Sequence, residues 1–169
     1  MLAQPVHSRP MALRSERVSF RVNGVEQAIE AEPNRSLGDV LRNAFALKGT
    51  RYGCGTEQCG ACFVLVDGEP AFACTTDVAT LAGKSITTVE GLGTVEAPHA
   101  LQRAFLSEQA AQCGYCTSGM LVAAAALLER MPHPTEDDVR RALDRNLCRC
   151  GSYQRIVRAV MRAAREARS

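Results

Sequence analysis

Four cysteines within one short stretch have the residue type and spacing to hold an iron–sulfur cluster. They are Cys54, Cys59, Cys62 and Cys74, in the pattern C-x4-C-x2-C-x11-C. This is the spacing of a plant-type [2Fe–2S] site, in which three thiolates lie on one tight loop and the fourth comes from a nearby strand. Gly53, Gly55 and Gly60 alternate with these cysteines, and glycine lets a backbone fold tightly. Zinc sites prefer two short cysteine pairs, so the pattern predicts iron and sulfide.

A second set of four cysteines follows later in the chain, as a C-x2-C pair and a C-x-C pair. They are Cys113, Cys116, Cys148 and Cys150. These pairs alone would also suit zinc, but beside the first set we interpret them as ligands of a second [2Fe–2S] cluster. Each pair precedes a segment with helical periodicity. Because an oxidised cluster with four thiolates is doubly negative, the N-terminus of a helix would stabilise it.

Short strands and turns are expected around the first cysteine set. Residues 18–22 and 25–30 flank Asn23-Gly24, which is typical of a tight hairpin turn. Ser36 suits the N-cap of a helix over residues 37–44, whose apolar residues share one face. The other expected strands are residues 63–66, 70–74 and 86–89. This order of elements favours a small β-grasp domain.

Helices are expected around the second cysteine set. Apolar periodicity predicts four of them, over residues 101–105, 120–131, 135–143 and 156–164. The segment from Thr135 to Asp138 resembles a capping box at the start of the third helix, and four short helices fit a compact bundle. The predicted fold class is therefore α+β. It comprises a flexible arm (1–16), a ferredoxin-like domain (17–95) and a helical domain (96–169).

The composition excludes several classes of function. The 169 residues include no Trp and only 5% aromatics, so we expect no stacking platform for nucleic acid. No apolar run is long enough to span a membrane, and residues 1–17 lack the apolar core of a secretory signal. We therefore expect synthesis and folding in the cytoplasm, where cysteines serve metal or redox chemistry more often than disulfides.

The histidines and charges indicate no substrate site. His7, His99 and His133 are expected at the surface, and no Ser-His-Asp or Cys-His set is recognisable. The net charge is only +2, but residues 140–169 hold nine Arg and two acidic side chains. This basic segment is either a solvated helix face or a docking surface for a larger partner. The chain is thus expected to hold two clusters and no catalytic residue.

Three motifs resemble one known family. They are Gly53-Cys-Gly-Thr-Glu-Gln-Cys-Gly-Ala-Cys62, Gln112-Cys-Gly-Tyr-Cys116 and Asn146-Leu-Cys-Arg-Cys-Gly-Ser-Tyr153. In this order they resemble the small iron–sulfur subunit of the xanthine oxidase family of molybdenum hydroxylases, over about residues 17–165. The resemblance implies a plant-type ferredoxin-like domain followed by a four-helix-bundle domain, each with one [2Fe–2S] cluster.

The resemblance also implies partners and further contacts. A large partner subunit would hold molybdopterin, commonly as molybdopterin cytosine dinucleotide, and would hydroxylate an aldehyde or an N-heteroaromatic compound. In this chain Gln112 would contact the pterin, and Cys150 would lie beside it. Electrons would pass from the helical-domain cluster to the ferredoxin-domain cluster, and then to an FAD subunit or a cytochrome c.

Two details of the sequence point to a branch of this family. Cys150 is followed by Gly-Ser-Tyr, and Ser118 stands where flavin-linked members often have Pro. This form is similar to the isoquinoline oxidoreductase and cytochrome-linked nicotinate or aldehyde dehydrogenase branch. The alternatives are a free two-cluster ferredoxin and a zinc-stabilised interaction module. A periplasmic location stays open for a complex whose partner subunit carries an export signal.

Overall fold

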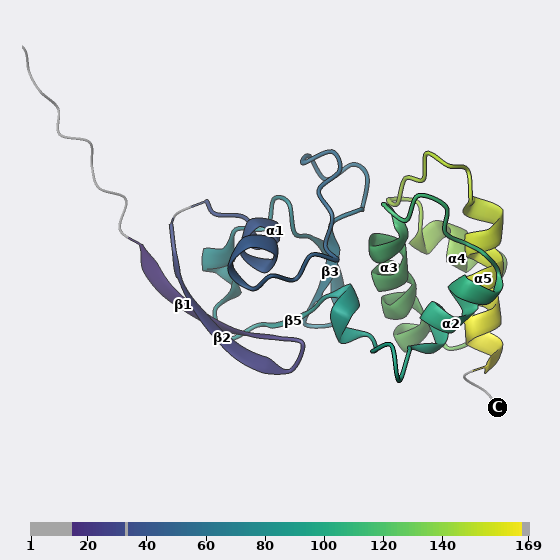
Figure 1. Cartoon of the computed structure of the whole chain (residues 1–169), viewed down its shortest axis with the longest axis horizontal. Coiled ribbons are helices and arrows are strands. Elements are labelled where there is room, and N and C mark those ends of the chain that lie inside the picture. The colour runs from purple at the N-terminus through teal and green to yellow at the C-terminus, as the bar shows by residue number, and fades with distance from the viewer. Residues whose placement is uncertain (1–14, 33, 167–169) are drawn as a thin grey trace, which may run out of the picture.

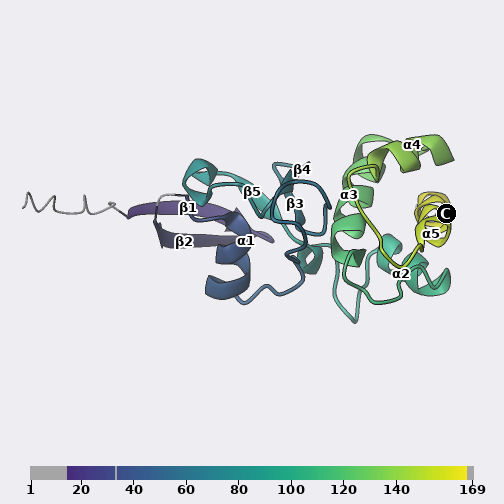
Figure 2. The ribbon, with the colours of Figure 1, turned by 90° about the horizontal axis from the view of Figure 1, so that it is seen from above.

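The computed structural model describes residues 15–32 and 34–166. A β-sheet with short helical segments forms one part of the molecule, and the helices of the C-terminal half form a second part beside it (Figures 1 and 2). The predicted α+β class is therefore confirmed. His7 and nearly all of the expected N-terminal arm lie outside the described residues.

Five strands form one mixed sheet. They are β1 (Glu16–Val22), β2 (Val25–Ala31), β3 (Phe63–Val66), β4 (Glu69–Phe72) and β5 (Ser85–Thr87), in the order β2-β1-β5-β3-β4. β1 and β5 pair in parallel, and the other pairs are antiparallel. Both hairpins turn on two residues with positive φ, Asn23-Gly24 at 49° and 82° and Asp67-Gly68 at 50° and 86°. Such turns match the twist of the paired strands, as the sequence predicted for the first hairpin.

The helix over the sheet changes its hydrogen bonding part-way. Ser36 caps α1 (Leu37–Asp39), because its hydroxyl accepts the N–H of Asp39 at 3.2 Å. The helix expected over residues 37–44 is present, but its second half, Val40–Ala44, is a π-helical turn. The turn closes through the N–H of Phe45, which donates to the carbonyl of Val40 at 3.1 Å. The apolar face is still buried, because Val40 at the start of the turn is fully enclosed.

Four α-helices form the second part. They are α2 (Ala100–Ser107), α3 (Thr117–Arg130), α4 (Glu136–Ala142) and α5 (Tyr153–Glu166). All four expected helices are present, with shifts of a few residues at their ends. α3 lies between the sheet and the other helices (Figure 2). Its middle residues, including Met120, Val122 and Ala124, are therefore fully buried.

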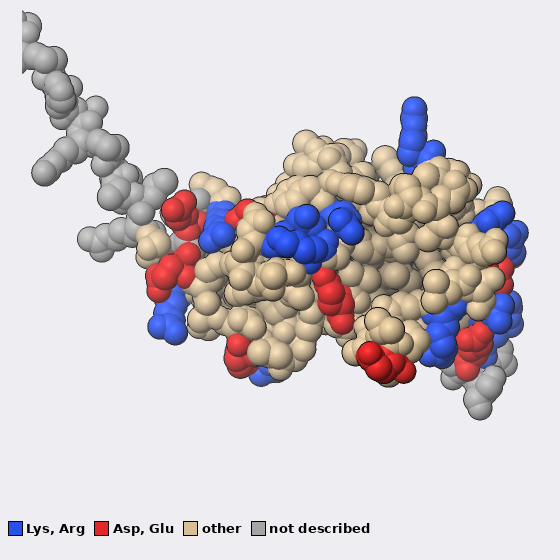
Figure 3. Space-filling model, in the orientation of Figure 1, with Lys and Arg blue, Asp and Glu red and all other residues tan. Residues whose placement is uncertain are grey.

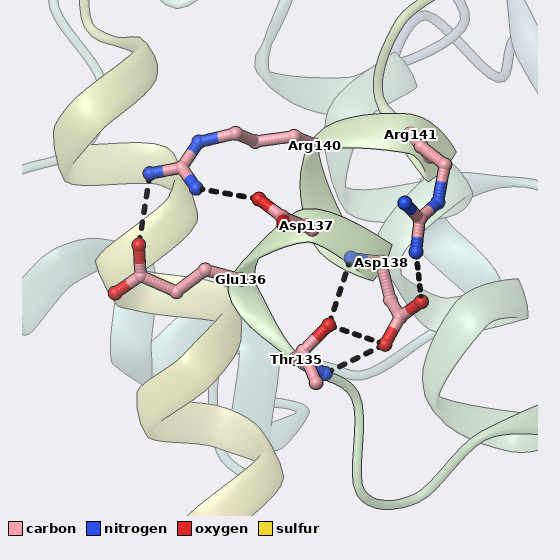
Figure 4. Close-up of polar contacts among 6 residues, drawn as sticks. All are labelled: Thr135, Glu136, Asp137, Asp138, Arg140 and Arg141. Atoms are coloured by element: carbon pink, nitrogen blue, oxygen red, sulfur yellow. Dashed lines mark hydrogen bonds and ion pairs between the residues drawn. The ribbon is translucent and has the colours of Figure 1, made fainter.

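The capping box of α4 is present (Figure 4). The Thr135 hydroxyl accepts the backbone N–H of Asp138 at 3.2 Å, and the Asp138 carboxylate accepts the backbone N–H of Thr135 at 2.8 Å. Arg141 then pairs with Asp138 at 2.6 Å. These bonds satisfy backbone donors that the first turn of a helix leaves without partners.

Replacing Thr135 by Ala should lower the free energy of unfolding by about 1 kcal/mol, because α4 loses its cap. The Thr135 hydroxyl and N–H, with Arg141, lower the pKa of Asp138 to about 2. A depressed folded-state pKa stabilises the protein above the unfolded value of about 4, and this stability is lost as the pH falls toward 2. Urea unfolding of both proteins at pH 7 and pH 3 should show the difference between them shrinking in acid. Equal stability at pH 7 would contradict the prediction, and Thr135→Ser is the control that keeps the cap.

The two described histidines have different environments. His133 is exposed, as predicted. His99 is only half-exposed and is the N-cap of α2, since its Nδ1 accepts the N–H of Leu101 at 3.2 Å. Burial lowers the pKa of His99, with a further contribution from Arg103. His99 therefore has a structural role that its sequence context did not indicate.

Many arginines of the basic C-terminal segment have acidic neighbours. Arg158 and Arg162 of α5 both pair with Glu108, and Arg140 pairs with Glu136 and Asp137. Positive and negative side chains lie next to one another at this end of the molecule (Figure 3). The pairing favours a solvated helix face. Within the described part of the chain, no helix is long and apolar enough to cross a membrane.

Candidate iron–sulfur sites

The loop before β3 folds around the sulfurs of Cys54 and Cys59. The backbone N–H groups of Thr56 and Gln58 donate to Cys54 Sγ at 3.4 and 3.2 Å, and the N–H of Cys54 donates to Cys59 Sγ at 3.3 Å. The two bonds to Cys54 Sγ, led by that of Thr56, lower the pKa of the Cys54 thiol to about 6. Hydrogen bonds to a thiolate favour its charged form, so the loop stabilises Cys54 as a thiolate.

Cys62 and Cys74 meet through the pairing of two strands. Cys62 comes directly before β3 and Cys74 lies two residues after β4, and the antiparallel register pairs Phe63 with Phe72. The N–H of Ala73 extends this pairing by donating to the carbonyl of Cys62 at 3.3 Å. The two thiols lie close together. The hairpin therefore brings the fourth cysteine to the loop that carries the other three.

The second set forms from two loops that each precede a helix. Cys116 is the N-cap of α3, and Cys150 lies three residues before Tyr153, the first residue of α5. The sulfur of Cys113 lies close to that of Cys150, and the sulfur of Cys116 lies close to that of Cys148. Each contact thus joins one cysteine of the C-x2-C pair to one of the C-x-C pair.

In each cysteine set, burial around one cysteine favours a positively charged group beside it. Burial raises the pKa of the Cys62 thiol to about 12 and that of the Cys116 thiol to about 12. All eight cysteines are free thiols. A buried thiolate is costly unless a cation lies beside it, and ferric iron supplies that charge. Among the described residues, no three His, Cys, Asp or Glu side chains converge on one metal ion, but a [2Fe–2S] cluster spreads four thiolates over two irons.

Buried polar atoms without partners also gather beside the cysteines. In the described part of the chain these atoms are Thr50 Oγ1, Ser118 Oγ, Asn146 Oδ1 and Ser152 Oγ. Each belongs to a residue within four positions of a cysteine. An orphaned buried polar group in a folded protein requires an explanation, such as an ion or a water. The residues present therefore fit two iron–sulfur clusters.

The two cysteine sets are in contact across the two parts of the molecule. The N–H of Leu147, next to Cys148, donates to the carbonyl of Cys59 at 2.9 Å. The buried side chain of Asn146 donates to the carbonyl of Gly60 at 3.2 Å. A hollow of about 170 Å³ lies between the sets and is lined by cysteines of both. In Figure 1 the loops that carry them gather along one edge of the molecule.

Comparison with known proteins agrees with this geometry. A family model described as "2Fe-2S iron-sulfur cluster binding domain" matches residues 20–86, and one described as "[2Fe-2S] binding domain" matches residues 88–161. A nicotinate dehydrogenase subunit of Pseudomonas putida is 50% identical over 87% of this chain and 94% of its own. The alpha subunit of isoquinoline 1-oxidoreductase from Brevundimonas diminuta is 46% identical over 89% of this chain and 99% of its own.

Solved structures show the same likeness. Quinoline 2-oxidoreductase from Pseudomonas putida 86 matches with a TM-score of 0.87 and 41% identity, over 92% of this chain and 97% of that one. Aldehyde oxidoreductase from Desulfovibrio gigas matches with a TM-score of 0.87 and 41% identity, over 90% of this chain but only 17% of that one. This chain is a [2Fe–2S] subunit of the xanthine oxidase family. As such it is an electron-transfer component of a molybdenum-dependent oxidoreductase with a larger partner.

The residues expected to contact the pterin of this family stay predictions. The Gln112 side chain is exposed, as is the neighbouring Cys113, whereas Cys150 is half-buried. The family resemblance implies that Gln112 contacts the pterin held by a partner subunit. Its exposure in the single chain leaves its amide accessible to a partner subunit.

Sequence reasoning missed several residues that shape the sites of this subunit. Leu147 and Asn146 lie inside a motif that was used only for its cysteines and for its likeness to a family, and their backbone and amide contacts join the two halves. The Tyr153 hydroxyl accepts the N–H of Cys148 at 2.7 Å. An Asn two residues before a ligand pair and a Tyr three residues after it were the available signals. Their partners could not be read from the sequence because they are set by folding.

Proposed function

We propose that this subunit carries electrons from a molybdopterin centre in its large partner, through its two clusters, to a cytochrome c or flavin acceptor. The observation that supports it most directly is the hydrogen bond from the N–H of Leu147 to the carbonyl of Cys59. It joins the backbone beside Cys148 to a cysteine of the other set. A [2Fe–2S] cluster, when bound, takes up and releases single electrons.

The residues of the chain would divide this task. Cys113, Cys116, Cys148 and Cys150 would hold the inner cluster, and Cys54, Cys59, Cys62 and Cys74 would hold the outer cluster. The exposed amide of Gln112 would bind the pterin edge of a molybdopterin cytosine dinucleotide held in the partner, with Cys150 beside it, because an amide offers both a donor and an acceptor. The loop around Cys54 is exposed and would face the acceptor.

The substrate class is supported by the names of relatives. Besides nicotinate dehydrogenase and isoquinoline 1-oxidoreductase, a nicotine 6-hydroxylase small subunit of Paenarthrobacter nicotinovorans is 44% identical over 86% of this chain. These names favour an N-heteroaromatic substrate over an aldehyde. Ser118 and the sequence after Cys150 support a cytochrome c acceptor. We further propose that the subunit is made and folded in the cytoplasm.

Purification of the tagged chain from its own host tests the proposal. We expect a large molybdenum-bearing subunit to co-purify, with about four iron and four sulfide per copy of this chain. Gln112→Ala should keep the iron and lose part of the molybdenum, because the lost hydrogen bond contributes roughly 1–3 kcal/mol. Gln109→Ala, an exposed neighbour, is the matched control. A chain with full iron but no partner would favour a free ferredoxin, and stoichiometric zinc would favour an interaction module.

A further inference from the structure

The hydroxyl of Ser152 is buried and lacks a protein partner. Ser152 is only 4% exposed, and among the described residues no group forms a hydrogen bond with its Oγ. Its carbonyl accepts the N–H groups of Arg155 and Ile156, each at 3.0 Å, so Ser152 is the N-cap residue of α5. A serine at this position ordinarily caps the first turn with its hydroxyl. Here the hydroxyl is left free although the residue occupies the capping position.

The backbone of Ser152 lies beside one sulfur of the inner cysteine set. Its backbone N–H lies close to the Cys148 sulfur, as do those of Cys150 and Gly151. The free hydroxyl therefore belongs to a residue whose own backbone lies beside the inner cysteine set.

We propose that the Ser152 hydroxyl donates a hydrogen bond to a sulfur of the inner cluster and thereby raises the reduction potential of that cluster. Hydrogen bonds to the sulfurs are among the factors that set the potential of an iron–sulfur centre. Reduction adds one negative charge, so an O–H donor stabilises the reduced state more than the oxidised state. The alternative occupant of this position is a buried water, which would satisfy the hydroxyl without involving sulfur.

The inference rests on the proposed function only in that the inner cysteine set holds a cluster, and it is independent of partner and acceptor. A redox titration of the full chain, followed through the paramagnetic signals of both clusters, tests it. In Ser152→Ala we expect a lower inner midpoint, with the ratio of reduced to oxidised inner cluster falling about tenfold at the wild-type midpoint, or 59 mV. The outer midpoint should stay constant and serves as the internal reference. Ser107→Ala, an exposed serine at the end of α2, is the matched control.

A second measurement, made on the wild-type protein, tests the inference even if the Ser152→Ala protein folds poorly. In the wild-type protein, proton-resolved spectroscopy of the reduced inner cluster in H₂O and D₂O should detect an exchangeable proton coupled to it. Ser152→Thr, which retains the hydroxyl, should preserve both this proton and the midpoint. An unchanged inner midpoint in Ser152→Ala, with both signals intact, overturns the inference alone. A wild-type chain without an inner signal overturns it together with the inner half of the proposed function.

Discussion

Cys59→Ser should remove the outer cluster and abolish turnover with the external acceptor, while the inner cluster stays intact. The backbone N–H of Cys54 donates to the sulfur of Cys59, which lies in the loop that would hold the outer cluster. A serine hydroxyl is a poor substitute for a thiolate at iron. The inner set has no ligand on this loop. Substrate should therefore still reduce the molybdenum centre and the inner cluster of the assembled complex in a single turnover.

Two measurements on the complex check this expectation. Low-temperature spectra should show one paramagnetic signal in place of two, and steady-state assays should show no transfer to the natural acceptor. Gln58→Ala is the matched control on the same loop, because its backbone N–H to Cys54 is retained. Undiminished steady-state turnover of Cys59→Ser would show that electrons leave without the outer cluster, which would reverse the proposed order of the two clusters.

Gly119→Ala should destabilise the protein, although alanine ordinarily stabilises a helix interior by about 1 kcal/mol relative to glycine. Gly119 lies in α3 where the two parts of the molecule meet. A Cβ here would lie 3.0 Å from the carbonyl carbon of Gly60 and closer still to its oxygen. Gly60 itself is confined, because a Cβ on it would meet the Asn146 amide nitrogen at 2.5 Å and its φ of +65° disfavours other residues. We expect a net loss of about 1–3 kcal/mol from this overpacking.

The close packing of Gly60 against Gly119 and Asn146 should also determine the distance between the two clusters. Denaturant unfolding measures the stability of Gly119→Ala, and the magnetic interaction between the two reduced clusters measures their separation. Ala125→Gly on the same helix is the matched control, which should lose stability through helix propensity yet keep the interaction unchanged. A Gly119→Ala protein as stable as the wild type, with the same magnetic interaction, would show that the contact between Gly119 and Gly60 leaves room for a methyl group.

Local patterns in the sequence determined most of the elements. Hairpin turns, the cap of Ser36, the capping box of Thr135 and four helices depend on neighbours a few residues apart, and all of them are present. The same holds for the cysteine spacing, because three ligands on one loop are a local feature. The π-helical turn over Val40–Ala44 was missed, since apolar spacing predicts which face is buried but not the exact hydrogen-bond register.

Only the tertiary structure decided how these elements meet. The sequence could not show that Cys113 lies against Cys150 and Cys116 against Cys148, nor that Leu147 bonds to Cys59 across the two halves. It left both a solvated helix face and a docking surface open for the basic segment, whereas the structure pairs Arg158 and Arg162 with Glu108 of another element. Contacts between residues far apart in the chain depend on how whole surfaces pack, so no short pattern encodes them. The sequence by itself thus determined which chemistry the chain carries, and the packing of α3 against the sheet decided how the two cysteine sets are joined.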